Sequence, residues 1–159
     1  MIADQTGAIV ATYEKQHPVP GAEARRKVRM PPALLSRGPF AVSAVICHDG
    51  NFNDLVRPVA RAGGLLAIPS NDWKEIEQLH SPSAVWVAVM TGVPLIRSTG
   101  HGRSVVFDAA GRLVTMASSF DGPVELVADV PIGAPHRGTR PVTASARQPS
   151  GAAPSGTAV

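Results

Sequence analysis

A continuous run of small and apolar residues at positions 40–47 constrains the fold more than any other feature of the sequence. Glycine and proline precede this run, and the polar sequence His48-Asp49-Gly50 follows it. A short apolar run between two turn signals is typical of a strand that is buried on both faces. The sequence therefore predicts a sheet with this strand in its interior.

Two helical patterns alternate with further short apolar runs. Residues 52–62 carry apolar side chains at helical spacing before a Gly-Gly pair, and residues 81–91 form a second helical pattern that ends before Gly92. Strands are predicted at residues 8–13, 65–69, 94–98, 104–107, 113–116 and 124–130. A strand, a helix, a strand, a helix and then several strands predict an α/β fold with a substantial sheet.

A turn signal lies close to the first residue, at residues 4–7 (Asp-Gln-Thr-Gly). It predicts a hairpin whose second strand is residues 8–13 and whose first strand is residues 1–3 or lies before Met1. We therefore expect the chain to begin inside a sheet and to lack an N-terminal part of its domain.

Charge is distributed unevenly along the 159 residues, which hold 15 Lys and Arg, 12 Asp and Glu, and a formal net charge of +3. Residues 133–159 contain three arginines (Arg137, Arg140 and Arg147) and no acid, so residues 1–132 are electrically neutral. Three arginines without interleaved aromatics are a sparse footprint for nucleic acid, and we expect no such partner. The Pro-, Gly-, Ala- and Ser-rich composition predicts a disordered tail at residues 133–159 after one domain at residues 1–132.

A single cysteine excludes an internal disulfide, and no spacing of Cys and His resembles a zinc site, so we expect neither metal nor cofactor. The longest apolar stretch, residues 84–96, is interrupted by polar and turn residues and is shorter than the about 20 residues of a membrane helix. No signal-peptide pattern is visible at the N-terminus. As written, the chain is expected to be soluble.

Cys47 ends the predicted buried strand and stands directly before a turn and a helix. A nucleophile on a sharp strand-to-helix turn is exposed at the edge of a sheet, and the backbone N–H groups that follow it point to where an oxyanion would form. A helix N-terminus also favours the thiolate form of a nearby cysteine. The alternative is an inert cysteine buried in an apolar strand.

His48 and Lys15 are the candidate partners of Cys47. Neighbouring strand residues point to opposite faces, so we expect His48 to contribute its backbone N–H or to pack in the turn rather than to form a Cys–His dyad. Lys15 lies at a predicted strand end before a Pro-rich loop, where its side chain can turn into a cleft and stabilise a thiolate or an oxyanion. The alternative for Lys15 is a solvated side chain.

Two segments resemble motifs of the nitrilase (carbon–nitrogen hydrolase) superfamily. Residues 13–23, Tyr-Glu-Lys-Gln-His-Pro-Val-Pro-Gly-Ala-Glu, resemble its lysine motif, and residues 46–55, Ile-Cys-His-Asp-Gly-Asn-Phe-Asn-Asp-Leu, resemble its cysteine elbow. The Ser-Asn-Asp-Trp sequence at residues 70–73 and the segments after it follow in an order similar to the apolipoprotein N-acyltransferase branch. The resemblance covers roughly residues 3–117.

The resemblance implies the C-terminal portion of a four-layer α-β-β-α sandwich with a Glu-Lys-Cys triad. By position, Cys47 matches the nucleophile, Lys15 the catalytic lysine, Glu23 a glutamate that supports the site through Lys15, and Trp73 a substrate-binding residue. The implied partners are a small amide or ester, or a lipid acyl donor with an amine acceptor, and a second copy of the chain in a homodimer. An N-acyltransferase would place the domain outside the cytoplasm at a membrane.

The sequence also departs from the superfamily pattern. The general-base glutamate of the triad normally lies many tens of residues before the lysine, whereas the only acids before Lys15 are Asp4 and Glu14, and neither matches. Val87 and Met90 stand where an Arg and a Glu are usual on the helix behind the site. These departures imply a chain that is inactive alone.

The sequence is therefore compatible with three functions. The first is a fragment of a protein that resembles an apolipoprotein N-acyltransferase and transfers acyl groups through a cysteine thioester. The second is an amidase or nitrilase without a lipid substrate. The third is a non-catalytic remnant or binding module in which the cysteine is merely buried.

Overall fold

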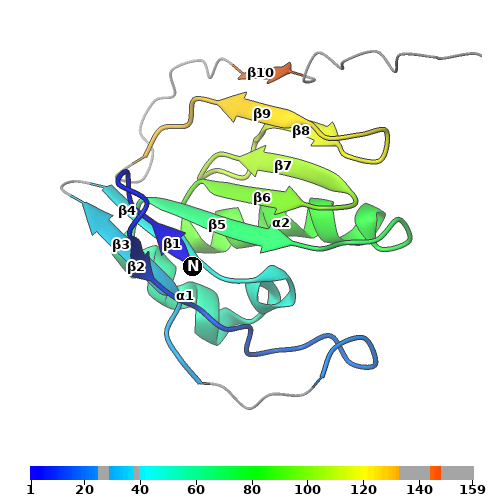
Figure 1. Cartoon of the computed structure of the whole chain (residues 1–159). Helices are drawn as coiled ribbons and strands as arrows, with labels where there is room; N and C mark the ends of the chain where they lie inside the picture. The colour runs from blue at the N-terminus through cyan, green and yellow to red at the C-terminus, as the bar shows by residue number, and fades with distance from the viewer. Residues whose placement is uncertain (25–28, 38–39, 133–143, 148–159) are drawn as a thin grey trace, which may run out of the picture.

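The computed structural model describes residues 1–24, 29–37, 40–132 and 144–147. Its main element is a six-stranded sheet in the order β3-β4-β5-β6-β7-β8 (Figure 1). These strands are β3 (Ala33–Arg37), β4 (Phe40–Ala44), β5 (Leu65–Ser70), β6 (Leu95–Thr99), β7 (Arg103–Phe107) and β8 (Leu113–Ser118). The three strands β4, β5 and β6 are parallel, and the flanking pairs are antiparallel. The predicted α/β class is confirmed.

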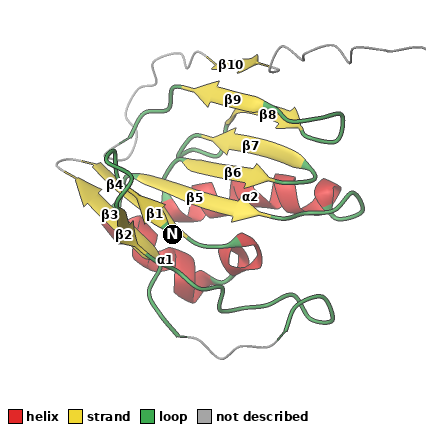
Figure 2. Cartoon of the chain, viewed as in Figure 1, coloured by secondary structure: helices red, strands yellow, loops and turns green. Residues whose placement is uncertain are grey.

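Both helices cover the same face of this sheet. α1 (Asn53–Ala62) joins β4 to β5 and α2 (Glu77–Thr91) joins β5 to β6, and parallel connections of one hand place successive helices on one side. The two helices contact each other, and Figure 2 shows them together behind the strands. Between helices and sheet lies the core, whose largest fully buried side chains include Leu66, Ile68, Leu95, Val45, Val56 and Val59.

The strand predicted at residues 40–47 is buried on one face only. Ala41, Ser43 and Val45 are buried toward the helices, whereas Val42 and Ala44 on the other face are half-buried. The expectation of burial on both faces is therefore wrong for this strand. Uninterrupted small apolar residues do not distinguish a fully covered strand from one whose second face is partly open.

The hairpin predicted at the start of the chain is confirmed. β1 (Ile2–Ala3) pairs antiparallel with β2 (Ile9–Ala11). The Asp4 carboxylate closes the turn by accepting hydrogen bonds from the backbone N–H groups of Thr6 at 2.8 Å and Ala8 at 3.3 Å. This is the local side-chain-to-backbone bonding that makes Asp frequent in turns.

The structure departs most from the sequence-based prediction at helix α2 and at strand β3. α2 begins at Glu77, four residues before the predicted start, and contains Pro82 in its interior. Strand β3 was not predicted, because its sequence follows two prolines and lies in a segment read as an irregular loop. Its antiparallel pairing with β4 gives it the regular structure that its own sequence does not signal.

The last predicted strand is also present, as β9 (Glu125–Ala128). It pairs with β10 (Ala144–Arg147), four residues within the segment expected to be without regular structure. The rest of residues 133–159 lies outside the described residues. Among the helices of the described ranges, none has the length and apolar character required to cross a membrane.

Candidate active site

Cys47 opens a sharp turn between strand β4, which lies next to the edge of the sheet, and helix α1. Residues Cys47–Asn51 form the short 3-10 helix η1, and the thiol residue itself has φ of 50°. Among the described residues it is the only one other than glycine with a positive φ. Such a backbone conformation costs free energy in an L-residue and is concentrated at functional sites. The Cys47 residue is 6% exposed.

Lys15 is paired with Glu23, as the lysine motif implies. Its Nζ lies 2.6 Å from Oε2 of Glu23, and the lysine side chain is only 14% exposed. The same Glu23 oxygen accepts the backbone N–H of Val19 at 2.7 Å. The Lys15 ammonium and then this N–H lower the pKa of Glu23. The alternative of a solvated lysine does not describe this side chain.

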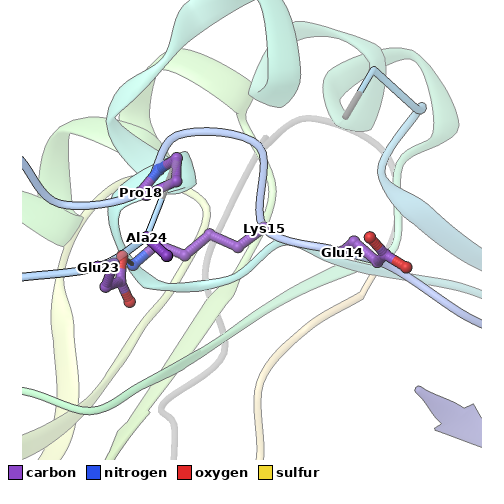
Figure 3. Close-up of a pocket in the computed structure, with 5 residues that line it drawn as sticks. All are labelled: Glu14, Lys15, Pro18, Glu23 and Ala24. Atoms are coloured by element: carbon purple, nitrogen blue, oxygen red, sulfur yellow. Dashed lines mark hydrogen bonds and ion pairs between the residues drawn. The ribbon is translucent and has the colours of Figure 1, made fainter. Parts of the chain in front are cut away.

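An open cavity of about 320 Å³ lies beside this ion pair. Its lining residues are Glu14, Lys15, Pro18, Glu23 and Ala24. Figure 3 shows the Lys15 side chain running toward Glu23, while the Glu14 carboxylate points in the opposite direction. Glu14 is thus next to Lys15 in the chain but does not face the ion pair.

A buried carboxylate, Asp49, joins the lysine segment (residues 13–17) to η1. It is 0% exposed and accepts hydrogen bonds from the Tyr13 hydroxyl at 2.7 Å and from the backbone N–H groups of Gln16 at 2.9 Å and His17 at 2.7 Å. Nδ1 of His17 lies 3.1 Å from Oδ1 of Asp49. Asp49 lies within the cysteine elbow, but the sequence alone indicated no role for it.

The buried position of Tyr13 beside Asp49 changes the pKa of its hydroxyl. Burial and then the hydrogen bond to Asp49 raise the pKa of its hydroxyl, so Tyr13 stays protonated and can donate over the whole physiological pH range. The aromatic position of the lysine motif therefore supplies a polar contact as well as apolar surface.

His48 packs within the turn. Its Nδ1 lies 3.2 Å from Nδ2 of Asn51, and its ring meets the edge of Phe52 with centroids 5.1 Å apart. The ring of His17 stacks against the ring of Phe52, with centroids 3.5 Å apart. Burial and then the positive charge of Lys15 lower the pKa of His48. The oxyanion role of the His48 backbone N–H stays a prediction.

Trp73 lies on a loop that a second buried carboxylate holds. Asp72 accepts hydrogen bonds from Nη2 of Arg97 at 3.0 and 3.1 Å, and Nδ1 of His80 lies 3.2 Å from the same carboxylate. Asp72 and Arg97 are 2% and 4% exposed, whereas Trp73 beside them is 42% exposed. The substrate-binding role of Trp73 stays a prediction.

Val87 and Met90, the two α2 residues that depart from the superfamily pattern, have different surroundings. Val87 is buried in the core between α2 and the sheet, and Met90 is 54% exposed beside helix α1, where it lines a cavity with Arg57. Val87 therefore stands where a charged residue would need a buried partner. No cluster of three or more His, Cys, Asp or Glu residues suited to a metal ion occurs within the described ranges.

Known proteins related to this chain are found among curated sequences and among solved structures. No family model matches the sequence. The apolipoprotein N-acyltransferase of Sinorhizobium medicae is 30% identical over 139 residues, which are 71% of this chain and 26% of the relative. The chain thus spans about a quarter of the length of that curated relative.

Solved structures add the fold. A variant of an amidase from Nesterenkonia AN1, described as a member of the nitrilase superfamily, matches with a TM-score of 0.60 and 26% identity over 73% of this chain and 49% of the amidase. Another variant of that amidase, with acetamide from fluoroacetamide added to its active-site cysteine, matches with a TM-score of 0.62, 26% identity and the same coverage. By sequence and by fold, this chain is a nitrilase-superfamily sequence that resembles the apolipoprotein N-acyltransferase branch.

Proposed function

We propose that residues 1–132 carry the cysteine–lysine part of an acyl-transfer site, with Cys47 as nucleophile and Lys15 as the cation that stabilises negative charge. The observation that supports this most is the hydrogen-bonded junction between the lysine segment and η1, the turn that Cys47 opens. The positive φ of Cys47 and the Lys15–Glu23 ion pair agree with it. The roles of these residues are inferred from their geometry and from the superfamily resemblance.

In the proposed reaction, Sγ of Cys47 attacks the carbonyl carbon of an amide or ester. An S–C bond forms, the C–N or C–O bond breaks, and the thiol proton passes to the leaving amine or alcohol. The thioester then transfers its acyl group to an amine or to water, which returns a proton to the sulfur. Lys15 and the backbone N–H of His48 oppose the negative charge on the carbonyl oxygen in both steps.

The proposal includes low activity of the chain by itself. In the superfamily mechanism a glutamate takes the thiol proton, and the two acids before Lys15 do not match it. Asp4 closes the β1–β2 turn, and Glu14 points away from the Lys15–Glu23 pair. We therefore expect Cys47 to react with activated acyl donors, which need no help from a base to lose their leaving group, and to turn over unactivated amides little.

Two substrate classes fit this chemistry. The curated relative favours a lipid acyl donor with an amine acceptor, and an extracytoplasmic domain at a membrane. The solved amidase favours a small amide. We place the acyl-transfer class first because the curated N-acyltransferase is 30% identical to this chain, whereas the solved amidase is 26% identical. We assign Trp73 and a second copy of the chain as further candidate contacts.

Acyl trapping tests the proposal. The full chain is incubated with an activated p-nitrophenyl ester, and the intact mass is followed over time. We expect one acyl group on Cys47, formed faster in the native chain than in the urea-unfolded chain, and no adduct in Cys47→Ala. Lys15→Met is expected to slow acylation about tenfold, because it removes the cation that we propose stabilises the thiolate and the oxyanion.

The outcome that contradicts the proposal is slower reaction in the native chain than in the unfolded one. That result favours the non-catalytic alternative, in which the cysteine is simply buried. The 6% exposure of Cys47 and the apolar residues at positions 87 and 90 are the observations on its side. Release of ammonia from a small amide would instead favour the amidase.

A further inference from the structure

Asp49 has the geometry of a residue that fixes one functional group relative to another. Its donors lie on both sides of Lys15 in the chain: the Tyr13 hydroxyl before it and the N–H groups of Gln16 and His17 after it. Asp49 itself lies two residues after Cys47 in η1. One fully buried carboxylate therefore touches the chain on either side of the lysine from within the cysteine turn.

The backbone of Asp49 is also held at both ends. Its N–H donates to the carbonyl of Ile46 at 3.0 Å, and its carbonyl accepts from the N–H of Phe52 at 3.1 Å. The carboxylate thus extends from a fixed point. The lysine segment, which has no regular secondary structure at residues 12–15, takes its position from these contacts.

We propose that Asp49 is a positioning residue that sets the place of Lys15 relative to Cys47. This inference rests on the proposed function, because it needs Lys15 to act on the sulfur. Glu23 holds the ammonium group at the far end of the lysine side chain, and Asp49 holds the backbone from which that side chain starts. The two carboxylates together leave Lys15 little freedom to move away from the turn.

The hydrogen-bond pattern requires two acceptor oxygens. Oδ2 of Asp49 accepts from the Tyr13 hydroxyl and the Gln16 N–H, and Oδ1 accepts from the His17 N–H and lies near its ring nitrogen. An amide has only one acceptor oxygen, so Asp49→Asn places an NH₂ group against a backbone N–H in either orientation, that of Gln16 or that of His17. This nearly isosteric change therefore disrupts the junction.

A double-mutant cycle on the rate of Cys47 alkylation tests the inference. Iodoacetamide is applied to the full chain over a range of pH, and the modified mass reports Cys47 alone because it is the single cysteine. We expect Lys15→Met and Asp49→Asn each to lower the rate at neutral pH about tenfold and to change its pH profile alike. In the Lys15→Met background, Asp49→Asn should change the rate less than twofold.

Asp108→Asn is the matched control. The Asp108 carboxylate is also buried and also accepts two backbone N–H groups, from Ala110 and Arg112, and a side-chain donor. It lies in the turn between β7 and β8, outside the proposed site. We expect this variant to lose stability and to keep its alkylation rate within twofold.

Tyr13→Phe is the second variant for this test and replaces Asp49→Asn if that variant does not fold. It removes one of the four contacts and should lower alkylation about twofold to threefold, again only when Lys15 is present. Equal decreases with and without Lys15, for either variant, would show that Asp49 has only a structural role. No effect of Lys15→Met would instead overturn the proposed function, and the inference with it.

Discussion

Two buried carboxylates, Asp49 and Asp72, hold their surroundings in different ways. Asp49 accepts mainly from neutral groups, two of which belong to the backbone. Asp72 accepts from the guanidinium group of Arg97 and lies beside the ring of His80. In this second cluster, Nε of Arg97 and Oγ1 of Thr99 have no hydrogen-bond partner in the described part of the chain.

The two regions are therefore sensitive to different substitutions. Only a substitution to proline deletes a backbone donor, so the Asp49 junction depends on the carboxylate itself and tolerates the loss of a single side chain. The Asp72 cluster depends on one buried ion pair, and removal of one partner leaves the other charge without compensation.

Arg97→Met is expected to lower the free energy of unfolding by about 3–5 kcal/mol, because it leaves the Asp72 carboxylate buried beside His80 alone. Urea denaturation followed by circular dichroism measures the loss. Arg112→Met is the control, since its side chain is 55% exposed in the pair with Asp108; it should cost less than about 1 kcal/mol. Equal losses in the two variants would remove the distinction between buried and exposed pairs.

Tyr13→Phe is expected to cost about 1 kcal/mol of unfolding free energy, the usual contribution of one hydrogen bond. The three remaining contacts still satisfy Asp49, so the loss should stay well below that of Arg97→Met. The same urea titration measures it. A loss as large as that of Arg97→Met would mean that the Asp49 junction is no more tolerant than the Asp72 cluster.

Glu23→Gln is expected to give the smallest effect, about 0.5 kcal/mol at pH 7, because the Glu23 side chain is 41% exposed and solvent screens its pair with Lys15. The pKa of Glu23 is lowered from 4.5 by folding, so this stabilisation is complete above pH 4.5 and disappears as the pH falls through the folded-state value. Urea midpoints of the two chains should therefore converge as the pH falls below the folded-state pKa of Glu23. A constant difference over this pH range would assign the effect to packing.

Local sequence patterns predicted most of the sheet and both helices. The alternation of apolar runs and turn signals identified β4 to β9 and the β1–β2 hairpin, because each is encoded by residues within a few positions of one another. Strand β3 was missed because its regular structure comes from pairing with β4. Burial on both faces of β4 was predicted wrongly, since coverage of a face depends on other elements.

In the candidate site, too, some residues could be predicted from the sequence and others could not. Cys47, Lys15 and Glu23 could be found from residue type, position and the superfamily resemblance, and the structure brings Lys15 and Glu23 into contact. The function of Asp49 could not be found, because its donors lie 32 to 36 positions away in the sequence. A polar residue after an apolar strand reads as a turn residue until its partners are known.

Because of the Asp49 junction, the position of the lysine segment relative to η1 does not depend on the length of the chain between them. The chain is held at Glu23 through Lys15 and again at Met30 through Gln16, so length added between these two points enters through the entropy of loop closure. That entropy rises slowly, by about 0.6 kcal/mol for each doubling of a flexible loop. This connection is therefore the place where insertions, tags or reporter peptides can be added while the distance between lysine and cysteine is preserved.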